Sequence, residues 1–183
     1  MAWVNPVEVA AGDPLTETLW NQDVVENTSV LRALTNVQQG TVNTSATYST
    51  GSTWQNTALA VTITPTFSTS KILISLSAYL SVASSTLGVW RIVRGASTVV
   101  TPSRTDGAGG GGAAFNGLIP DYDTSRAIAA AALVTLDSPG VTTAVTYTLQ
   151  VWPNGSVNVF LNRWALDTNW LMTSSIMAQE IPV

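Results

Sequence analysis

The stretch that decides the fold is KILISLSAYLSV, residues 71–82. Its even-numbered residues, from Ile72 to Val82, are all apolar, whereas its odd-numbered residues are polar except for Leu73. Successive side chains of a β-strand point to opposite faces of the sheet, so an apolar residue at every second position marks one buried face. The stretch therefore predicts a strand of an antiparallel sheet with one face in the core and the other exposed.

The same alternation returns elsewhere in the chain. It occurs at Leu59–Ile63, Val145–Val151 and Val157–Leu161, and the turn sequence PNG (153–155) between the last two predicts a hairpin. We expect further strands near residues 88–94, 97–101, 113–119, 127–136 and 173–181. With about eight to ten short strands and no alternation of strands with helices, residues 40–183 are expected to form an antiparallel β-sandwich or barrel.

Residues 1–39 differ from the rest and are expected to form a separate segment for attachment and oligomerisation. Thr16 is a favourable N-cap for a helix from Glu17 to about Leu34, and an acidic residue in the first turn suits the helix dipole. An extended arm precedes this helix. Four apolar residues of the arm are expected to anchor the protein to a partner, namely Trp3, Val4, Val7 and Val9.

One side of the expected helix carries residues with heptad spacing. They are Trp20, Val24, Asn27, Leu31 and Leu34, separated by four, three, four and three positions. Such a line, with a polar residue in its centre, is typical of a coiled-coil seam, and an amphipathic helix packed on its own domain is the alternative. We expect this helix to be the oligomerisation element.

The composition excludes several classes of function. The 183 residues include no cysteine and no histidine, which excludes disulfides, thiolate metal sites and histidine-based catalysis. Only 10% of residues are charged, against about 25% in a typical soluble domain, which suggests that neighbouring subunits cover much of the surface. A net charge of −4 with scattered basic residues disfavours nucleic-acid binding. The longest apolar run, Ala127–Val134, is too short for membrane insertion.

Three patterns resemble functional motifs but lack the context that those motifs need. The run GAGGGG, Gly107–Gly112, matches a dinucleotide-binding fingerprint, but Pro120 leaves no room for the helix that should follow. Asp121 and Asp123 are compatible with calcium binding or with a glycosidase pair, although a solvated turn is the preferred interpretation. The many serines have no histidine to activate them. We therefore expect no enzyme, no cofactor and no metal site.

Several segments resemble a domain that is common in virion proteins of tailed bacteriophages. They are TALAVTITPTFSTSKILISLSAYLSV (57–82), VWRIVRG (89–95), TLDSPGVTTAVTYTLQV (135–151), VFLNRW (159–164) and SSIMAQEI (174–181). This resemblance covers roughly Ala58 to Ile181 and implies a jelly roll of the tumour-necrosis-factor-like type, usually trimeric. The leader is also similar to that of many phage tail and fibre proteins, through Gly12, Leu15, Thr16, Trp20, Asn21 and Asn27.

The resemblance implies a non-enzymatic structural component of a bacteriophage virion. It implies a homotrimeric tail or fibre appendage, attached to other virion proteins by its N-terminal segment and contacting a host surface glycan or protein. The alternative is a capsid decoration protein, of the cement or head-fibre type, that binds the major capsid protein and stabilises the head. In both cases the protein is expected in the virion, assembled in the host cytoplasm, with no nucleic-acid partner and no membrane insertion.

Overall fold

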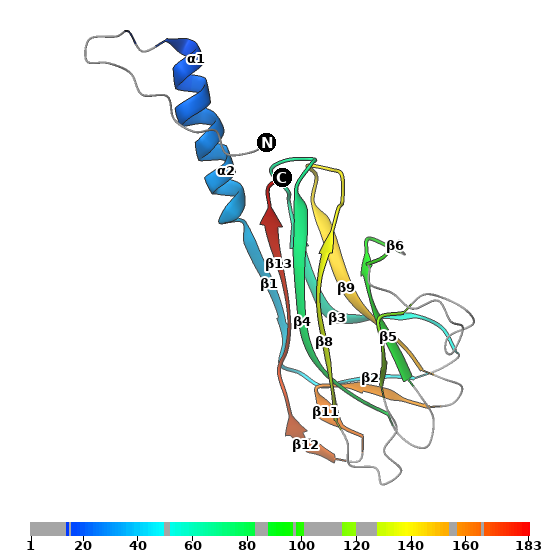
Figure 1. The fold of residues 1–183 in the computed structure, drawn as a ribbon. Helices are drawn as coiled ribbons and strands as arrows, with labels where there is room; N and C mark the ends of the chain where they lie inside the picture. Colours follow the sequence, from blue (N-terminus) through cyan, green and yellow to red (C-terminus); the bar gives the residue numbers. More distant parts are fainter. Residues whose placement is uncertain are drawn as a thin grey trace.

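Two antiparallel β-sheets packed face to face form the body of the protein, and a helix projects from one end of this sandwich (Figure 1). The computed structural model describes residues 14, 16–49, 52–82, 88–96, 98–100, 115–119, 128–153, 157–165 and 167–183. The predicted mainly β fold with one preceding helix is confirmed. The arm expected at residues 1–13 lies outside the described residues.

The first sheet has six strands, among them β1 and β13, the first and the last strand of the described chain. Its central strand β4 pairs on one side with β13 and β10, and on the other side with β8. The outer strands β1 and β2 pair with β13 and β10. In spatial order the strands are β1 (Val37–Val42), β13 (Ser174–Ile181), β4 (Lys71–Val82), β10 (Val159–Leu161) and β2 (Ala46–Tyr48), with β8 (Ala129–Asp137) beside β4.

The second sheet has five strands, and a two-stranded ribbon lies apart from both sheets. The five strands are β3 (Gln55–Ile63), β9 (Val145–Trp152), β5 (Gly88–Arg94) and β6 (Thr98–Val99), with β7 (Gly117–Ile119) also paired to β5. The ribbon consists of β11 (Arg163–Trp164) and β12 (Asp167–Leu171). The chain crosses between the sheets six times, from β2 to β3, β3 to β4, β4 to β5, β7 to β8, β8 to β9 and β9 to β10, which is the order of a jelly roll.

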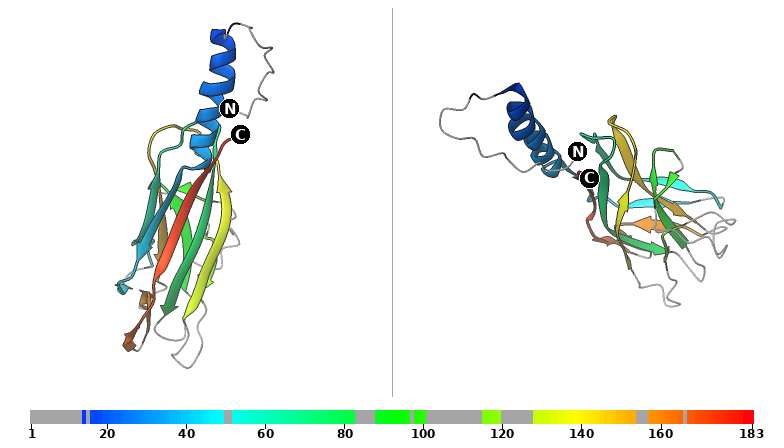
Figure 2. Two further views of the ribbon diagram at one scale, coloured as in Figure 1. Left: turned by 90° about the vertical axis from the view of Figure 1, so that its left-hand side faces the viewer. Right: turned by 45° about the horizontal axis from the view of Figure 1, so that its top comes forward.

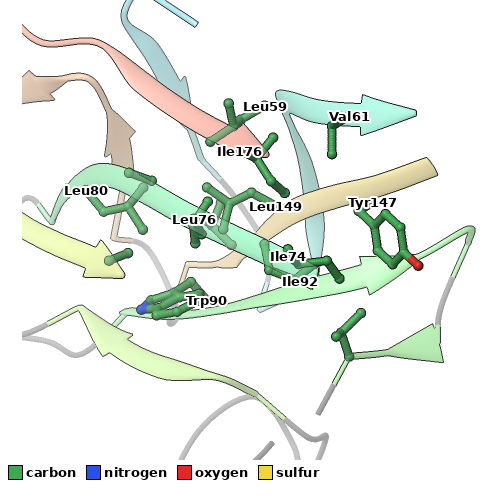
Figure 3. Packing of buried hydrophobic residues seen from close by; sticks show 14 of the residues in the cluster. Leu59, Val61, Ile74, Leu76, Leu80, Trp90, Ile92, Tyr147, Leu149 and Ile176 are labelled. Carbon is green, nitrogen blue, oxygen red and sulfur yellow. The ribbon is translucent and has the colours of Figure 1, made fainter. Parts of the chain in front are cut away.

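The core lies between the two sheets and is built from the alternating positions of their strands. In β4 the residues from Ile72 to Val82 at even positions are all buried, as the sequence pattern predicts. They pack against Trp90, Leu149 and other residues of the second sheet (Figure 3). Each fully buried aliphatic or aromatic side chain contributes about 1.5–3 kcal/mol of transfer free energy, so this layer supplies most of the driving force for folding.

The hairpin predicted at residues 153–155 is not formed. The strand before it, β9, pairs with β3 and β5 in the second sheet, whereas β10 pairs with β2 and β4 in the first sheet. The Asn-Gly sequence indicates a turn but does not determine whether the chain returns to the same sheet.

Strand β1 enters the first sheet already at Val37, before the expected domain boundary at residue 40. Its residue Gly40 lies so close to β3 that a Cβ atom there would be 1.9 Å from the backbone oxygen of Ala60. A glycine at this position therefore permits the close approach of the two sheets along this edge.

Candidate functional site

The first part of the candidate site is the helix, which has a capped N-terminus and a π-helical segment in its middle. It consists of α1 (Glu17–Trp20), the π-helical segment η1 (Asn21–Glu26) and α2 (Asn27–Leu34). The predicted N-cap is confirmed, because Thr16 Oγ1 accepts a hydrogen bond of 3.2 Å from the backbone N–H of Leu19. The helix points away from the sandwich in all three views (Figures 1 and 2).

Four of the five predicted seam residues are exposed and apolar. They are Trp20, Val24, Leu31 and Leu34, and each has between 40 and 52% of its surface exposed. Val25, which the heptad pattern does not include, is exposed as well. Such a concentration of exposed large apolar side chains on one helix is unusual for a protein that acts as a monomer.

Asn27, expected at the centre of the seam, is buried, unlike the other four seam residues. Only 3% of its surface is exposed, so it is buried within the chain itself, together with Val30 and Ala33. The π-helical segment η1 lies between Trp20 and Leu31, and because a π-turn contains more residues than an α-turn, it rotates Trp20 around the helix axis relative to Leu31. The exposed residues therefore do not follow a straight heptad line.

The base of the helix is fixed to the sandwich through Asn36. Its side-chain N–H₂ group donates to the backbone oxygen of Thr64 at 2.9 Å and to the carboxylate of Glu180 at 2.8 Å. Its backbone oxygen accepts a hydrogen bond of 3.0 Å from the N–H of Glu180. Asn36 is the second residue after α2, so these bonds set the direction in which the helix leaves the sandwich.

The carboxylate of Glu180 is fully buried and receives five hydrogen bonds. Besides Asn36, the donors are the backbone N–H groups of Thr66 and Phe67 and the hydroxyls of Thr66 and Ser70, at 2.7–3.2 Å. Burial opposes the charge, but these donors outweigh it and hold the pKa of Glu180 below its ordinary value. We name this arrangement the Glu180 clamp; it joins the helix base, the 64–70 loop and β13.

The Glu180 clamp was not predicted from the sequence, although one feature points to it. Along β13 the inward positions are Ser174, Ile176, Ala178 and Glu180, all buried. An acidic residue at an inward position of an alternating strand requires several donors, because an unpaired buried charge is very costly. The identity of those donors depends on residues more than a hundred positions away in the sequence.

The other described carboxylate in the body of the sandwich is also engaged. Asp137 Oδ2 lies 2.7 Å from Arg94 Nη1 and accepts a hydrogen bond of 2.8 Å from the hydroxyl of Tyr147. Burial, together with this bond to Asp137, raises the pKa of Tyr147. The three residues come from β5, β8 and β9 and connect the two sheets near the end that carries the helix.

A group of planar side chains lies beside the second sheet. The guanidinium of Arg91 stacks 3.9 Å from the centre of the Trp54 ring, and Trp152 meets the same ring edge-on at 5.5 Å. Arg91 Nε donates to Gln150 at 2.7 Å, and Gln150 donates to Asn56 at 2.7 Å. Stacking and hydrogen bonding hold these groups in one arrangement, and burial lowers the pKa of Arg91.

Several predicted site residues lie outside the described residues. These are the arm residues Trp3, Val4, Val7 and Val9, the Gly107–Gly112 run, and Asp121 with Asp123. Within the described part of the chain, no group of three or more histidine, cysteine, aspartate or glutamate residues is placed to hold a metal ion.

Comparison with known proteins adds no assignment, since neither a protein-family model nor a curated protein matches this sequence. Among the helices of the described ranges, none is both long and apolar enough to cross a membrane. The exposed helix and the Glu180 clamp at its base are therefore the features on which a function can be built.

Proposed function

We propose that this protein is a non-enzymatic structural component of a tailed-bacteriophage virion, a homotrimeric tail or fibre appendage attached by its N-terminal segment. The observation that carries the proposal is a helix with four exposed seam residues that projects from a firmly packed sandwich. A single helix of 18 residues is marginally stable in water, whereas association with copies of itself would bury its apolar side chains.

The remaining features support an assembly role rather than a catalytic one. The described carboxylates in the sandwich, Asp137 and Glu180, are engaged in bonds that hold the fold together. The sequence offers no histidine or cysteine as a base, nucleophile or metal ligand. The end of the sandwich opposite the helix, which carries the β11–β12 ribbon, is the part that would face the host surface (Figure 1).

The test is complementation of a phage that lacks this protein. The full chain and a chain beginning at Asn36, which keeps all of β1 and the Glu180 clamp, would be produced during infection and purified particles blotted. We expect the truncated chain to fold as a β-protein but to be missing from the particles. Equal incorporation of both chains would show that attachment does not need the helix.

A matched pair of full-length variants tests attachment by the helix without removing any residues. Leu31→Asp places a charge on the exposed seam, whereas Thr28→Asp places one on an exposed helix residue that is not on the seam. We expect only the first to lower incorporation. Immunogold labelling of intact particles then locates the protein, and label on the head instead of the tail would favour the capsid decoration role.

A further inference from the structure

The group of planar side chains beside the second sheet lies on the outer face of that sheet. The core-facing residues of β3 and β9 are the odd-numbered ones, so the even-numbered residues of both strands point outward. In the strand register Asn56 lies opposite Gln150, and Gln150 lies opposite Arg91. We call this group the Trp54 platform and define it by Trp54, Asn56, Arg91, Gln150 and Trp152.

The Trp54 platform has a buried polar base with aromatic rings above it. Only 9% of Arg91 and 5% of Gln150 are exposed, although the outer face of an antiparallel sheet is usually open to water. One face of the Trp54 ring lies on the guanidinium of Arg91, and Trp152 meets the same ring edge-on. Trp54 is half-buried, and with one face on Arg91 the opposite face of the ring is the one left for a ligand.

A chain of hydrogen bonds fixes the amide of Asn56 in one orientation. Arg91 Nε donates to Gln150 Oε1 at 2.7 Å, and Gln150 Nε2 donates to Asn56 Oδ1 at 2.7 Å. The oxygen of Asn56 is therefore engaged, while the residue itself is exposed. Its N–H₂ group has no acceptor within the described ranges, so two donors face solvent beside the tryptophan rings.

Stability alone does not account for the Trp54 platform. The indole N–H of Trp54 is buried and has no acceptor among the described residues, which costs about 1–3 kcal/mol. An aliphatic side chain would cover the strand without this cost. The register of β3 is also irregular between Asn56 and Ala60, and such bulges re-aim side chains and are frequent next to functional sites. These features indicate a binding site.

We infer that the Trp54 platform binds a neutral saccharide. One side of a pyranose ring presents C–H groups, which are attracted to the electron-rich face of an indole, and the hydroxyls at its rim accept hydrogen bonds. The open face of Trp54 and the N–H₂ group of Asn56 are placed for these two contacts. A cationic ligand is disfavoured because Arg91 already occupies the other face of the Trp54 ring, and an anionic ligand finds the charge of Arg91 buried.

The Trp54 platform lies on the half of the second sheet that is remote from the helix. Thr64 accepts a hydrogen bond from Asn36 at the helix base, and Asn56 precedes Thr64 by eight residues along β3 and its end. At about 3.3 Å per strand residue, Asn56 is roughly 25 Å from the helix base. A role of this site in contacting a glycan of the host surface rests on the proposed function, whereas the binding itself is a property of the chain alone.

The test uses the purified full-length protein, with sugar binding measured by saturation-transfer NMR and by titration. The neutral probes are lactose, cellobiose, maltose and N,N′-diacetylchitobiose; glucuronate, and glucosamine in mildly acidic buffer, are the charged probes. Trp54→Ala removes the ring, whereas Asn56→Asp keeps an acceptor for Gln150 and removes both donors. Trp20→Ala on the helix and Gln39→Glu on the first sheet are the matched controls at exposed positions. Circular dichroism verifies that each variant is folded.

We expect at least one neutral disaccharide to bind the wild type and both controls equally. Trp54→Ala and Asn56→Asp are each expected to weaken this binding about tenfold or more, because each removes one of the two contacts. If Trp54→Ala does not fold, Asn56→Asp decides the question.

Three results would overturn the inference. They are the absence of binding by all four neutral sugars, unchanged binding by the folded platform variants, and tighter binding of a charged sugar than of every neutral one. The outcome is separable from that of the proposed function: sugar binding by a protein that is missing from particles would contradict the virion role and leave the saccharide site in place.

Discussion

Glu180 shows how one buried charge can organise a junction between elements. Its carboxylate oxygens accept from neutral donors, contributed by Asn36 and by Thr66, Phe67 and Ser70 of the 64–70 loop. Hydrogen bonds to a charged group are stronger than those between neutral groups, and their loss leaves several donors without an acceptor. The same residue therefore stabilises the sandwich and fixes the base of the helix.

Glu180→Gln is predicted to destabilise the protein by about 2–4 kcal/mol at neutral pH, because an amide presents a donor to groups that are themselves donors. The lowered pKa means that this stability is complete above the ordinary glutamate pKa of about 4.3 and is lost as the pH falls through the folded-state value. Urea unfolding at several pH values measures the effect. The difference in unfolding free energy between the variant and the wild type should shrink in acid. The control Glu17→Gln, in the exposed first turn of the helix, should lower the free energy of unfolding by only about 0.3–1 kcal/mol.

Tyr147→Phe is predicted to change the alkaline limit of stability. The raised pKa of the buried phenol stabilises the folded state below the unfolded value of about 10, and this contribution is lost as the pH rises further. The variant should be about 1–2 kcal/mol less stable at neutral pH, since it loses the bond to Asp137, but should be less sensitive to alkali. Tyr79→Phe, at a half-buried position of β4, is the control; an identical alkaline loss in both variants would contradict the assignment.

For single residues, the sequence predicted those roles that depend on neighbours a few positions away and missed those that depend on distant parts of the chain. Thr16 was recognised as a cap because its partner is three residues away. The burial of Asn27 could not be foreseen, since this residue shares the α-helical segment α2 and the heptad spacing with the exposed Leu31 and Leu34, and the spacing does not distinguish them.

Among the elements, β1 is the longest of four strands that the sequence did not predict; the others are β2, β11 and β12. The residues of β1, VQQGTV, are mostly polar and show no apolar alternation, and β1 becomes a strand through its pairing with β13. The strand β4 was predicted correctly because one of its faces is entirely apolar and the other is mostly polar. The connection from β9 to β10 was mistaken for a hairpin, because turn residues specify a local bend and not the sheet that the next strand joins.

The close approach of β1 to β3 leads to a prediction at Gly40. Alanine at this position would place its Cβ against the backbone of Ala60, so the strands must separate. We expect Gly40→Ala to lower the free energy of unfolding by about 2–3 kcal/mol, measured in urea. Gln39→Ala, the exposed neighbour on the same strand, should change it by less than about 0.5 kcal/mol. Equal effects of the two substitutions would show that β1 does not pass this close to β3.

The whole molecule is held together by packing between sheets and by a few polar connections across them. The Arg94–Asp137–Tyr147 group joins β5, β8 and β9, and the Glu180 clamp joins the first sheet to the helix base. Both lie toward the end from which the helix projects. The chain thus achieves a stable body without disulfides, as expected for a domain of this length.

The absence of histidine and cysteine from the sequence predicts that stability does not depend on a bound metal ion. The melting temperature should be the same with and without a chelator. Asp121→Asn provides the specific check, with Asp106→Asn as the control. A drop in melting temperature on chelation that disappears only in the Asp121 variant would instead establish a calcium site.

Residue 183 lies beside the base of the helix, and the β11–β12 ribbon lies at the far end of the sandwich (Figure 1). This polarity makes the two positions unequal for protein engineering. If the protein has the virion role proposed above, a peptide appended after residue 183 would lie next to the attachment end, where a particle would cover it. The same peptide grafted onto the ribbon would be displayed outward in every copy, so the fold offers a one-sided scaffold for presenting antigens or binding sequences.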